Sequence, residues 1–194
     1  MFYNSYGGNM EKIQRQILHI DVNNAFLSWT AIDRLAMGET LDIRNIEAVI
    51  GGDETKRSGI VLAKSTKAKK KGVTTGETLY QARLKCPNLQ VFKGDYKSYK
   101  KHSNDLYNIL SQYTDKIERF SIDECFLDMT GCLIGESLLS KAYEINKRVK
   151  EELGFTVNVG VAHNKLLAKM ASDFTKPDKV HTLFEEEIPS KMWT

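Results

Sequence analysis

Two adjacent acidic residues constrain the fold of this chain more than any other feature. Asp123 and Glu124 lie in the segment SIDECFLD, residues 121–128, whose remaining residues indicate paired β-strands. Neighbouring strand residues point to opposite faces of a sheet, so at least one of the two acids must face a crowded interior or cleft. An unpaired carboxylate there is costly unless a cation compensates it. Mg²⁺, which prefers oxygen ligands, is the simplest such cation. A magnesium site on carboxylates would in turn suggest phosphoryl transfer.

A third acid ends the first apolar run of the chain. Asp21 follows residues 16–20 and precedes an amphipathic stretch with helical spacing, residues 25–36. This order places Asp21 at the C-terminal end of a strand, the edge at which α/β sites usually lie. Three carboxylates on adjacent strands can hold two Mg²⁺ ions about 3.5–4 Å apart. Isolated acids at strand ends also commonly cap helices or form turns, so the residues alone leave both interpretations open.

Charge is distributed unevenly along an otherwise ordinary composition. The 194 residues are 41% hydrophobic and 27% charged with a net charge of +3, typical of a soluble protein with one domain or two small ones. Lysines gather at 64–71 and again at 93–101. Such runs form either a solvated face or a binding surface for a polyanion, and charge alone does not choose between them.

Cysteine usage predicts a reducing compartment, so we expect a cytoplasmic protein. Cys86, Cys125 and Cys132 are odd in number and lack CxxC spacing, which argues against a disulfide framework and against a zinc site. No apolar run reaches the length of a membrane span, so we expect no membrane partner. The polar residues 1–9 lack the apolar core of a signal peptide.

Hydrophobic periodicity predicts an α+β fold. The main elements follow the ferredoxin-like order β-α-β-β-α-β, which gives an antiparallel sheet of four strands with helices on one face. Residues 34–91 form an insertion with a small sheet of its own. The predicted strands are 16–21, 46–51, 59–64, 90–93, 117–122, 125–129, 155–162 and 179–184, and the predicted helices are 24–37, 66–72, 79–85, 96–113, 137–153 and 164–174. The last residues add no closing element, so we expect a fragment.

Three blocks of sequence carry a specific pattern: IDVNNAF at 20–26, SIDECFLD at 121–128 and GVAHNKLLAK at 160–169. In residues and in order, these blocks resemble the Y-family translesion DNA polymerases, the group of DNA polymerase IV and UmuC. The resemblance implies a palm sheet with an inserted fingers subdomain. The implied divisions are a flexible lead-in at 1–15, palm at 16–33, fingers at 34–91, palm at 92–178, and the end of the palm or the start of a truncated thumb at 179–194.

The resemblance also implies a two-metal site. Asp21 and Asp123 would bridge two Mg²⁺ ions, for which Mn²⁺ can substitute. Glu124 would bind the metal that activates the primer 3′-hydroxyl, and the backbone carbonyl of Val22 would complete one coordination shell. Metals in these positions neutralise the charge that accumulates during phosphoryl transfer.

The same resemblance implies a nucleotide site. Phe26 matches the steric gate that excludes a ribose 2′-hydroxyl, with Asn24 and Ala25 beside it, and Lys165 matches a lysine that meets the triphosphate. Without the resemblance, Phe26 would be a core aromatic and Lys165 an ordinary surface lysine. Thr66 and Lys69 stand where many members carry Tyr and Arg, a pattern closer to UmuC, and neither reproduces the Arg fork. Asn23 replaces an acid that is common two positions after the first metal ligand.

The expected function is template-directed addition of deoxynucleotides to a primer, of the lesion-bypass type. Its partners would be primer-template DNA and an incoming dNTP, with a sliding clamp contacted only through a C-terminal region outside this chain. The fragment alone is expected to be weak or inactive. Two alternatives stay open: a palm-type nucleotidyl cyclase, and a non-catalytic polymerase-like scaffold that recruits other proteins.

Overall fold

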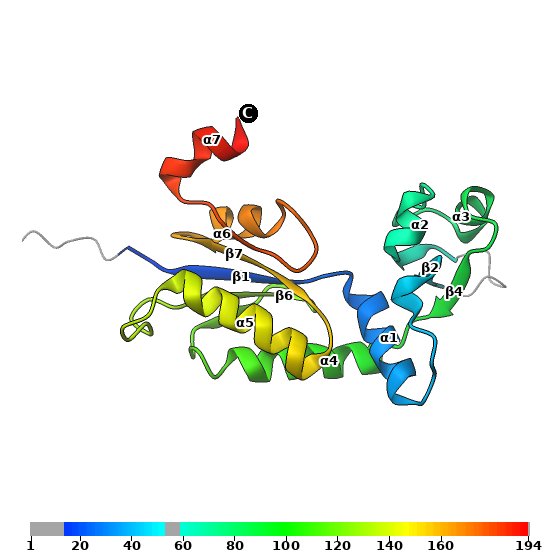
Figure 1. Ribbon diagram of the computed structural model, residues 1–194, viewed down its shortest axis with the longest axis horizontal. Coiled ribbons are helices and arrows are strands. Elements are labelled where there is room, and N and C mark those ends of the chain that lie inside the picture. The colour runs from blue at the N-terminus through cyan, green and yellow to red at the C-terminus, as the bar shows by residue number, and fades with distance from the viewer. Residues whose placement is uncertain (1–13, 53–58, 194) are drawn as a thin grey trace, which may run out of the picture.

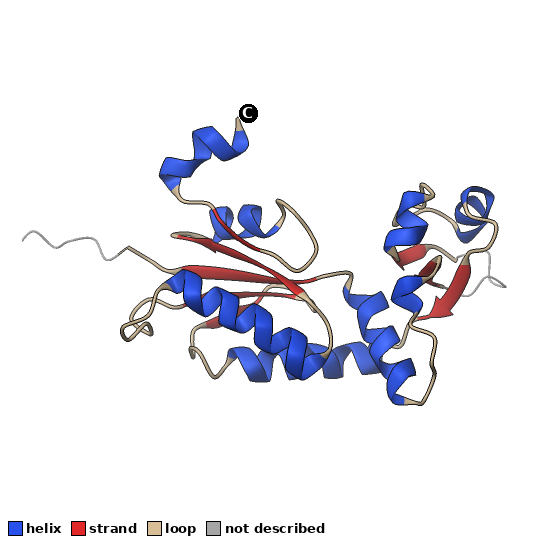
Figure 2. Cartoon of the chain, in the orientation of Figure 1, coloured by secondary structure: helices blue, strands red, loops and turns tan. Residues whose placement is uncertain are grey.

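Two separate sheets organise the protein. The computed structural model describes residues 14–52 and 59–193, so most of the predicted lead-in and the polar turn at 53–58 lie outside the described residues. The larger sheet has the strand order β5-β6-β1-β7-β8, with β1 at its centre. Figure 2 shows the two sheets on either side of one helix. The strands of the larger sheet are β1 (Ile17–Val22), β5 (Ile117–Arg119), β6 (Glu124–Asp128), β7 (Val157–Ala162) and β8 (Val180–Thr182).

The order of the first four strands is the one that the ferredoxin-like pattern predicts. β1 pairs antiparallel with β6 and β7, and β5 pairs antiparallel with β6. The last strand predicted, at 179–184, is observed as β8, and it joins this sheet as a fifth strand because it pairs parallel with β7. The sheet is therefore mixed at one edge, where the sequence predicted an antiparallel sheet of four strands.

Helices cover both faces of the larger sheet, whereas the sequence predicted one covered face. Helices α4 (Tyr96–Leu110) and α5 (Leu138–Leu153) bury the main apolar core against alternate strand residues such as Leu18 and Ile20. Helix α6 (Lys165–Ser172) packs on the opposite face, as Figure 1 shows. Period-2 alternation directs Asp21 and Glu124 to this α6 face.

Gly160 lets α6 approach the sheet closely. A Cβ atom on Gly160 would lie 1.8 Å from the carbonyl oxygen of Ala168, so only glycine permits this contact between helix and strand backbones. Because α6 lies so close to β7, the side chains at the end of α6 reach the strand ends that carry the acids.

The smaller sheet lies within the predicted insertion. β2 pairs antiparallel with β3 and parallel with β4. The bounds of the 34–91 insertion itself stay a prediction. The elements of this part are the short 3₁₀ helix η1 (Ile43–Asn45), β2 (Ala48–Gly51), β3 (Val61–Lys64), α2 (Thr66–Lys70), α3 (Leu79–Lys85) and β4 (Gln90–Lys93).

Helix α1 (Ala25–Ala36) joins the two parts. Trp29 is fully buried in the core of the larger sheet. Leu27 and Ala31 pack instead in a second apolar cluster with η1 and the small sheet. The chain ends with the 3₁₀ helix η3 (Glu185–Glu187) and helix α7 (Ile188–Met192), which the sequence did not predict. No helix of the described residues is both long and apolar enough to cross a bilayer.

Candidate active site

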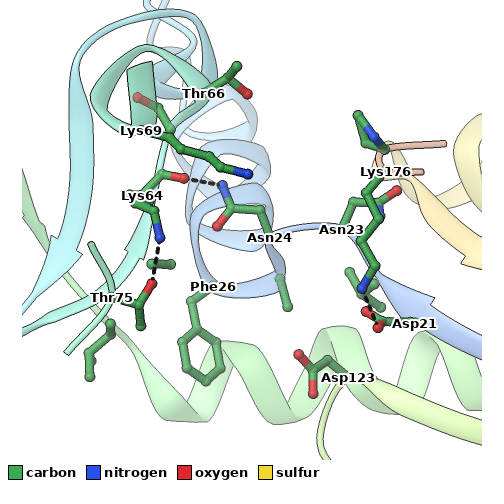
Figure 3. A pocket seen from close by; sticks show the side chains of 16 residues that line it. Asp21, Asn23, Asn24, Phe26, Lys64, Thr66, Lys69, Thr75, Asp123 and Lys176 are labelled. Atoms are coloured by element: carbon green, nitrogen blue, oxygen red, sulfur yellow. Dashed lines mark hydrogen bonds and ion pairs between the residues drawn. The ribbon is translucent and has the colours of Figure 1, made fainter. Parts of the chain in front are cut away.

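A pocket of about 490 Å³ opens where the two parts meet. One wall is formed by the end of β1 and by Asp123, and the facing wall by β3, the start of α2 and Thr75 (Figure 3). The N-terminus of α1 lies between the two walls, and Lys176 enters from the segment after α6.

The structure brings the three predicted acids to one end of the large sheet. Asp21 of β1 and Glu124 of β6 are direct cross-strand partners. Asp123 lies in the turn before β6 and not inside a strand, because β5 ends at Arg119. The backbone N–H of Val22 donates to the carbonyl of Asp123 at 3.0 Å, which fixes that turn beside β1. Asp21, Val22 and Asp123 line the pocket.

Asp21 and Glu124, the two site acids that lie on strands, are each paired with a lysine. Lys176 Nζ lies 2.7 Å from Asp21 Oδ2 and 2.8 Å from Asp173 Oδ1. Lys169 of α6 forms an ion pair with Glu124. Asp123 instead accepts a hydrogen bond of 2.7 Å from the Ser121 hydroxyl. The lysines come from α6 and the segment after it, so the close packing of α6 supplies the positive charge at these acids.

The donor chemistry of this end of the sheet suits a hard divalent cation. Burial raises the pKa of Asp21, Lys176 opposes that rise, and the charges of Glu124 and Asp123 add to it. Mutual repulsion among carboxylates is the condition that a bound cation relieves, and carboxylate oxygens are ligands that Mg²⁺ accepts. As the side chains stand, no three acids, histidines or cysteines among residues 14–52 and 59–193 form a ready metal-binding group.

Phe26 lies in the pocket and also packs on the core. Its ring stacks on Tyr99 with centroids 4.7 Å apart and planes 11° apart, and it packs against Tyr96 in an edge-to-face arrangement with centroids 5.8 Å apart. Tyr99 is fully buried, and its hydroxyl hydrogen-bonds to Thr30 at 2.9 Å. The two interpretations of Phe26, pocket aromatic and core aromatic, are therefore compatible.

The facing wall of the pocket contains the two residues of the lysine-rich segment that the sequence predicted to bind nucleotide. Thr66 and Lys69 line the pocket from α2. Ser65 fixes the start of α2, because its buried hydroxyl accepts from the Ala68 N–H at 3.1 Å. Lys64 Nζ donates to Thr75 at 2.9 Å, and both residues line the pocket.

Lys165 is not brought to this pocket. It forms an ion pair with Glu118 and lies 5.6 Å from the centroid of the Phe126 ring, in a separate hollow beside β5 and β6. Lys176 faces the pocket instead. Sequence reasoning missed Lys176, and its only local signal is a lysine before Pro177 just beyond a predicted helix.

Asn23 accounts for part of the position of Lys176. Its buried side chain accepts from Thr156 Oγ1 at 3.0 Å and from the Asp178 N–H at 2.8 Å, and it donates to Asn158 at 3.1 Å. These bonds hold the segment that follows Lys176 against β1 and β7. Asn23 thus acts as a structural connector between the ends of these two strands and the segment after Lys176.

A model of the impB/mucB/samB family matches residues 20–173. The chain belongs to the impB/mucB/samB family. It is 55% identical over 181 residues to a DNA polymerase IV of Clostridium acetobutylicum, an alignment covering 93% of this chain and 46% of the relative. It is 42% identical to a DNA polymerase IV of Acetivibrio thermocellus, covering 93% of this chain and 44% of that one. This impB/mucB/samB family member therefore spans a little under half the length of these relatives.

Solved structures agree with this family assignment. The DinB structure from Sulfolobus solfataricus superimposes with a TM-score of 0.79 at 27% identity, covering 90% of this chain and 50% of that one. A Y-family DNA polymerase chimera gives a TM-score of 0.77, also at 27% identity, covering 90% of this chain and 50% of the chimera. The resemblance to Y-family polymerases and the predicted α+β fold are both confirmed.

Proposed function

We propose that this chain is the palm-and-fingers portion of a template-directed DNA polymerase of the translesion type. The observation that carries the proposal is the pocket itself. Its palm wall presents Asp21 and Asp123, and its other wall presents Lys64, Thr66 and Lys69 from the inserted segment. Carboxylates facing cations across one pocket suit a metal-bound triphosphate. The relatives named DNA polymerase IV support this assignment.

The acids are the proposed ligands of two Mg²⁺ ions, for which Mn²⁺ can substitute. Asp21, Asp123 and Glu124 would hold them, with the Val22 carbonyl as a further oxygen donor. When bound, such ions neutralise charge on the triphosphate and activate the primer 3′-hydroxyl. The three side chains already lie at the same end of the sheet, because Asp21 and Glu124 are cross-strand partners and Asp123 directly precedes Glu124.

Three groups of this chain are proposed to hold the triphosphate. Lys176 and Lys69 supply charge from opposite walls of the pocket. The first turn of α1 supplies backbone N–H groups at Ala25 and Phe26, because the first amides of a helix have no intrahelical acceptor and carry the positive end of the helix dipole. Lys176 is proposed as the triphosphate-binding lysine instead of Lys165, because Lys165 lies in another hollow.

Phe26 is proposed to select the sugar. A ring in the pocket excludes a 2′-hydroxyl only if it cannot move away. Stacking on Tyr99 keeps the Phe26 ring in position, because Tyr99 is itself fully buried and hydrogen-bonded to Thr30.

The remaining partners follow from the proposed activity. They are primer-template DNA, an incoming dNTP and a sliding clamp contacted through a region outside this chain, with the cytoplasm as the compartment. The proposed subdomain divisions are those that the resemblance implied: palm at 16–33 and 92–178, fingers at 34–91, and the start of a thumb within 179–194.

Primer extension tests the proposal. A chimera joins this chain to the remaining part of the Clostridium acetobutylicum relative, and extension is measured with Mg²⁺ or Mn²⁺. Asp123→Asn, which keeps the size of the side chain but removes its charge, should lower extension at least 100-fold, since even outer-shell changes at metal sites cost about 10–100-fold. Asp105→Asn on α4, whose carboxylate pairs with Lys101, is the matched control and should leave extension unchanged.

The same chimera separates the alternatives. Template-independent conversion of ATP or GTP to a cyclic product, without extension, would indicate a nucleotidyl cyclase. A chimera that binds primer-template but extends no better than its Asp123→Asn variant would indicate a non-catalytic scaffold. Either outcome would overturn the polymerase assignment.

A further inference from the structure

Asn24 has an uncommon backbone conformation at the edge of the pocket. Its φ of 51° and ψ of 52° lie in the left-handed region, which residues other than glycine seldom adopt. Asparagine tolerates this region better than most side chains. A strained residue that the surrounding structure maintains at a pocket is grounds for asking what its side chain does there.

The side chain of Asn24 does not cap the helix that it precedes. Asn24 is the N-cap residue of α1, where asparagine usually accepts a hydrogen bond from an amide of the first turn, but its side chain makes no such bond. Its Nδ2 instead donates to the Lys64 carbonyl at 2.7 Å, as Figure 3 shows. Because a carbonyl can only accept, this contact requires the amide NH₂ group to face Lys64.

This hydrogen bond joins the two walls of the pocket. Lys64 is the last residue of β3, and α2 with Thr66 and Lys69 begins two residues later. Helix α1 also contacts the small sheet through an apolar cluster that includes Leu27 and Ile50, and the Arg34 guanidinium lies 4.6 Å from the centroid of the Phe92 ring. Apolar contact is non-directional, so it contributes little to the relative orientation of the two parts. The hydrogen bond of Asn24 adds a directional constraint at the pocket itself.

We propose that Asn24 is a positioning residue that sets the width of the pocket. It ties the start of α2 to the end of β1 and thereby aligns Thr66 and Lys69 with the palm acids. By turning away from α1, its side chain also leaves the first amides of that helix open to a phosphate. The part concerning nucleotide rests on the proposed function, whereas the bridge between the walls does not. The role differs from the direct nucleotide contact that the sequence resemblance implied for Asn24.

Two substitutions isolate the bridge. Asn24→Gly keeps the left-handed conformation and removes only the amide. Asn24→Asp keeps the shape but cannot donate to the Lys64 carbonyl, and its carboxylate would cap α1 instead. Asn164→Asp is the matched control, because Asn164 is the N-cap of α6 and its side chain already accepts from the Leu167 N–H at 2.9 Å.

Hydrogen–deuterium exchange of the full 194-residue chain tests the bridge directly. Both Asn24 variants should speed exchange in peptides covering residues 61–70 by about fivefold, the effect of one hydrogen bond. Peptides from α5 should be unchanged, and Asn164→Asp should leave residues 61–70 at the wild-type rate. Unchanged exchange at 61–70 in Asn24→Gly would overturn the proposal.

Binding of dATP with Mg²⁺, measured by calorimetry on the same proteins, tests the consequence. Asn24→Gly should weaken binding about fivefold, because one hydrogen bond is lost. Asn24→Asp should weaken it further, since it places a negative charge beside the amides of α1. Faster exchange without weaker binding would overturn the positioning role. A wild-type chain that binds no dATP would count against the proposed function, and the exchange result would still decide whether Asn24 bridges the walls.

Discussion

Lys176 Nζ lies 2.7 Å from Asp21 Oδ2, although 155 residues separate the two in the sequence. The contact places a cation against a partly buried carboxylate whose pKa is raised by burial and by its acidic neighbours. A metal ion entering the pocket would compete with Lys176 for Asp21, and a triphosphate would compete with Asp21 for Lys176. If the proposed function holds, the pair would exchange partners when both ligands enter together.

Removal of Lys176 should separate metal binding from nucleotide binding. In Lys176→Gln, Mn²⁺ affinity without nucleotide should rise about tenfold and dATP affinity should fall by a similar factor, since a charged hydrogen bond contributes about 1.5–3 kcal/mol. Electron paramagnetic resonance measures free Mn²⁺, and calorimetry measures dATP. Lys150→Gln removes another lysine that pairs with an aspartate, Asp178, at 2.6 Å and should change neither. A loss of Mn²⁺ affinity in Lys176→Gln would show that no competition exists.

Truncation of Phe26 should relax sugar selection. Phe26→Ala in the chimera should raise the ratio of ribonucleotide to deoxyribonucleotide incorporation at least tenfold, which corresponds to about 1.4 kcal/mol in relative barrier. The ratio of kcat/KM for ATP and dATP measures the effect. Tyr80→Ala changes an exposed aromatic on α3 and serves as the control. Equal sugar ratios in wild type and Phe26→Ala would remove the gate assignment.

A side chain at Gly160 should separate α6 from the sheet. The added Cβ of Gly160→Ala would meet the Ala168 carbonyl at 1.8 Å, so the variant should lose about 3 kcal/mol in unfolding free energy, the upper end of the usual range for overpacking. Gly38→Ala is the comparison, because its Cβ meets nothing within 4 Å and only its positive φ opposes the change, at about 1–2 kcal/mol. Urea denaturation of both variants measures the difference, and equal losses would contradict the close packing of α6.

His19 should make the metal-free chain sensitive to mild acid. Burial, helped by the nearby charge of Lys169, lowers its pKa from 6.5 to about 4. Below pH 6.5 the unfolded chain binds a proton that the folded chain does not, so stability should fall by about 3 kcal/mol between pH 6.5 and 4.

Urea denaturation in EDTA across that range measures the loss. In His19→Gln the unfolding free energy should differ much less between pH 6.5 and pH 4 than in wild type. His163→Gln, which keeps His19, should show the wild-type difference. If His19→Gln and wild type lose the same unfolding free energy between pH 6.5 and pH 4, groups other than His19 cause the loss.

Local sequence patterns determined most of the elements and the main site residues. Helix α3 and strand β4 have the predicted bounds, and Ser137, the first residue of the helix predicted at 137–153, is the N-cap of α5, because spacing and caps depend on residues close together in the chain. Asp21, Asp123 and Phe26 were found because each lies in a contiguous motif, at 20–26 or at 121–128, and all three line the pocket.

Only the tertiary structure decided which lysine faces the pocket. Lys165 begins α6 and Lys176 follows its end, so their sequence context separates them little. The choice depends on the path of α6 across β7, which the backbone contact at Gly160 sets, and on the bonds that Asn23 makes to residues more than 130 positions away. Periodicity carries no information about such contacts, because they arise when whole elements pack. For the same reason the motif at 20–26 pointed to Asn24 as a site residue, whereas only the packed structure shows that its side chain binds the Lys64 carbonyl.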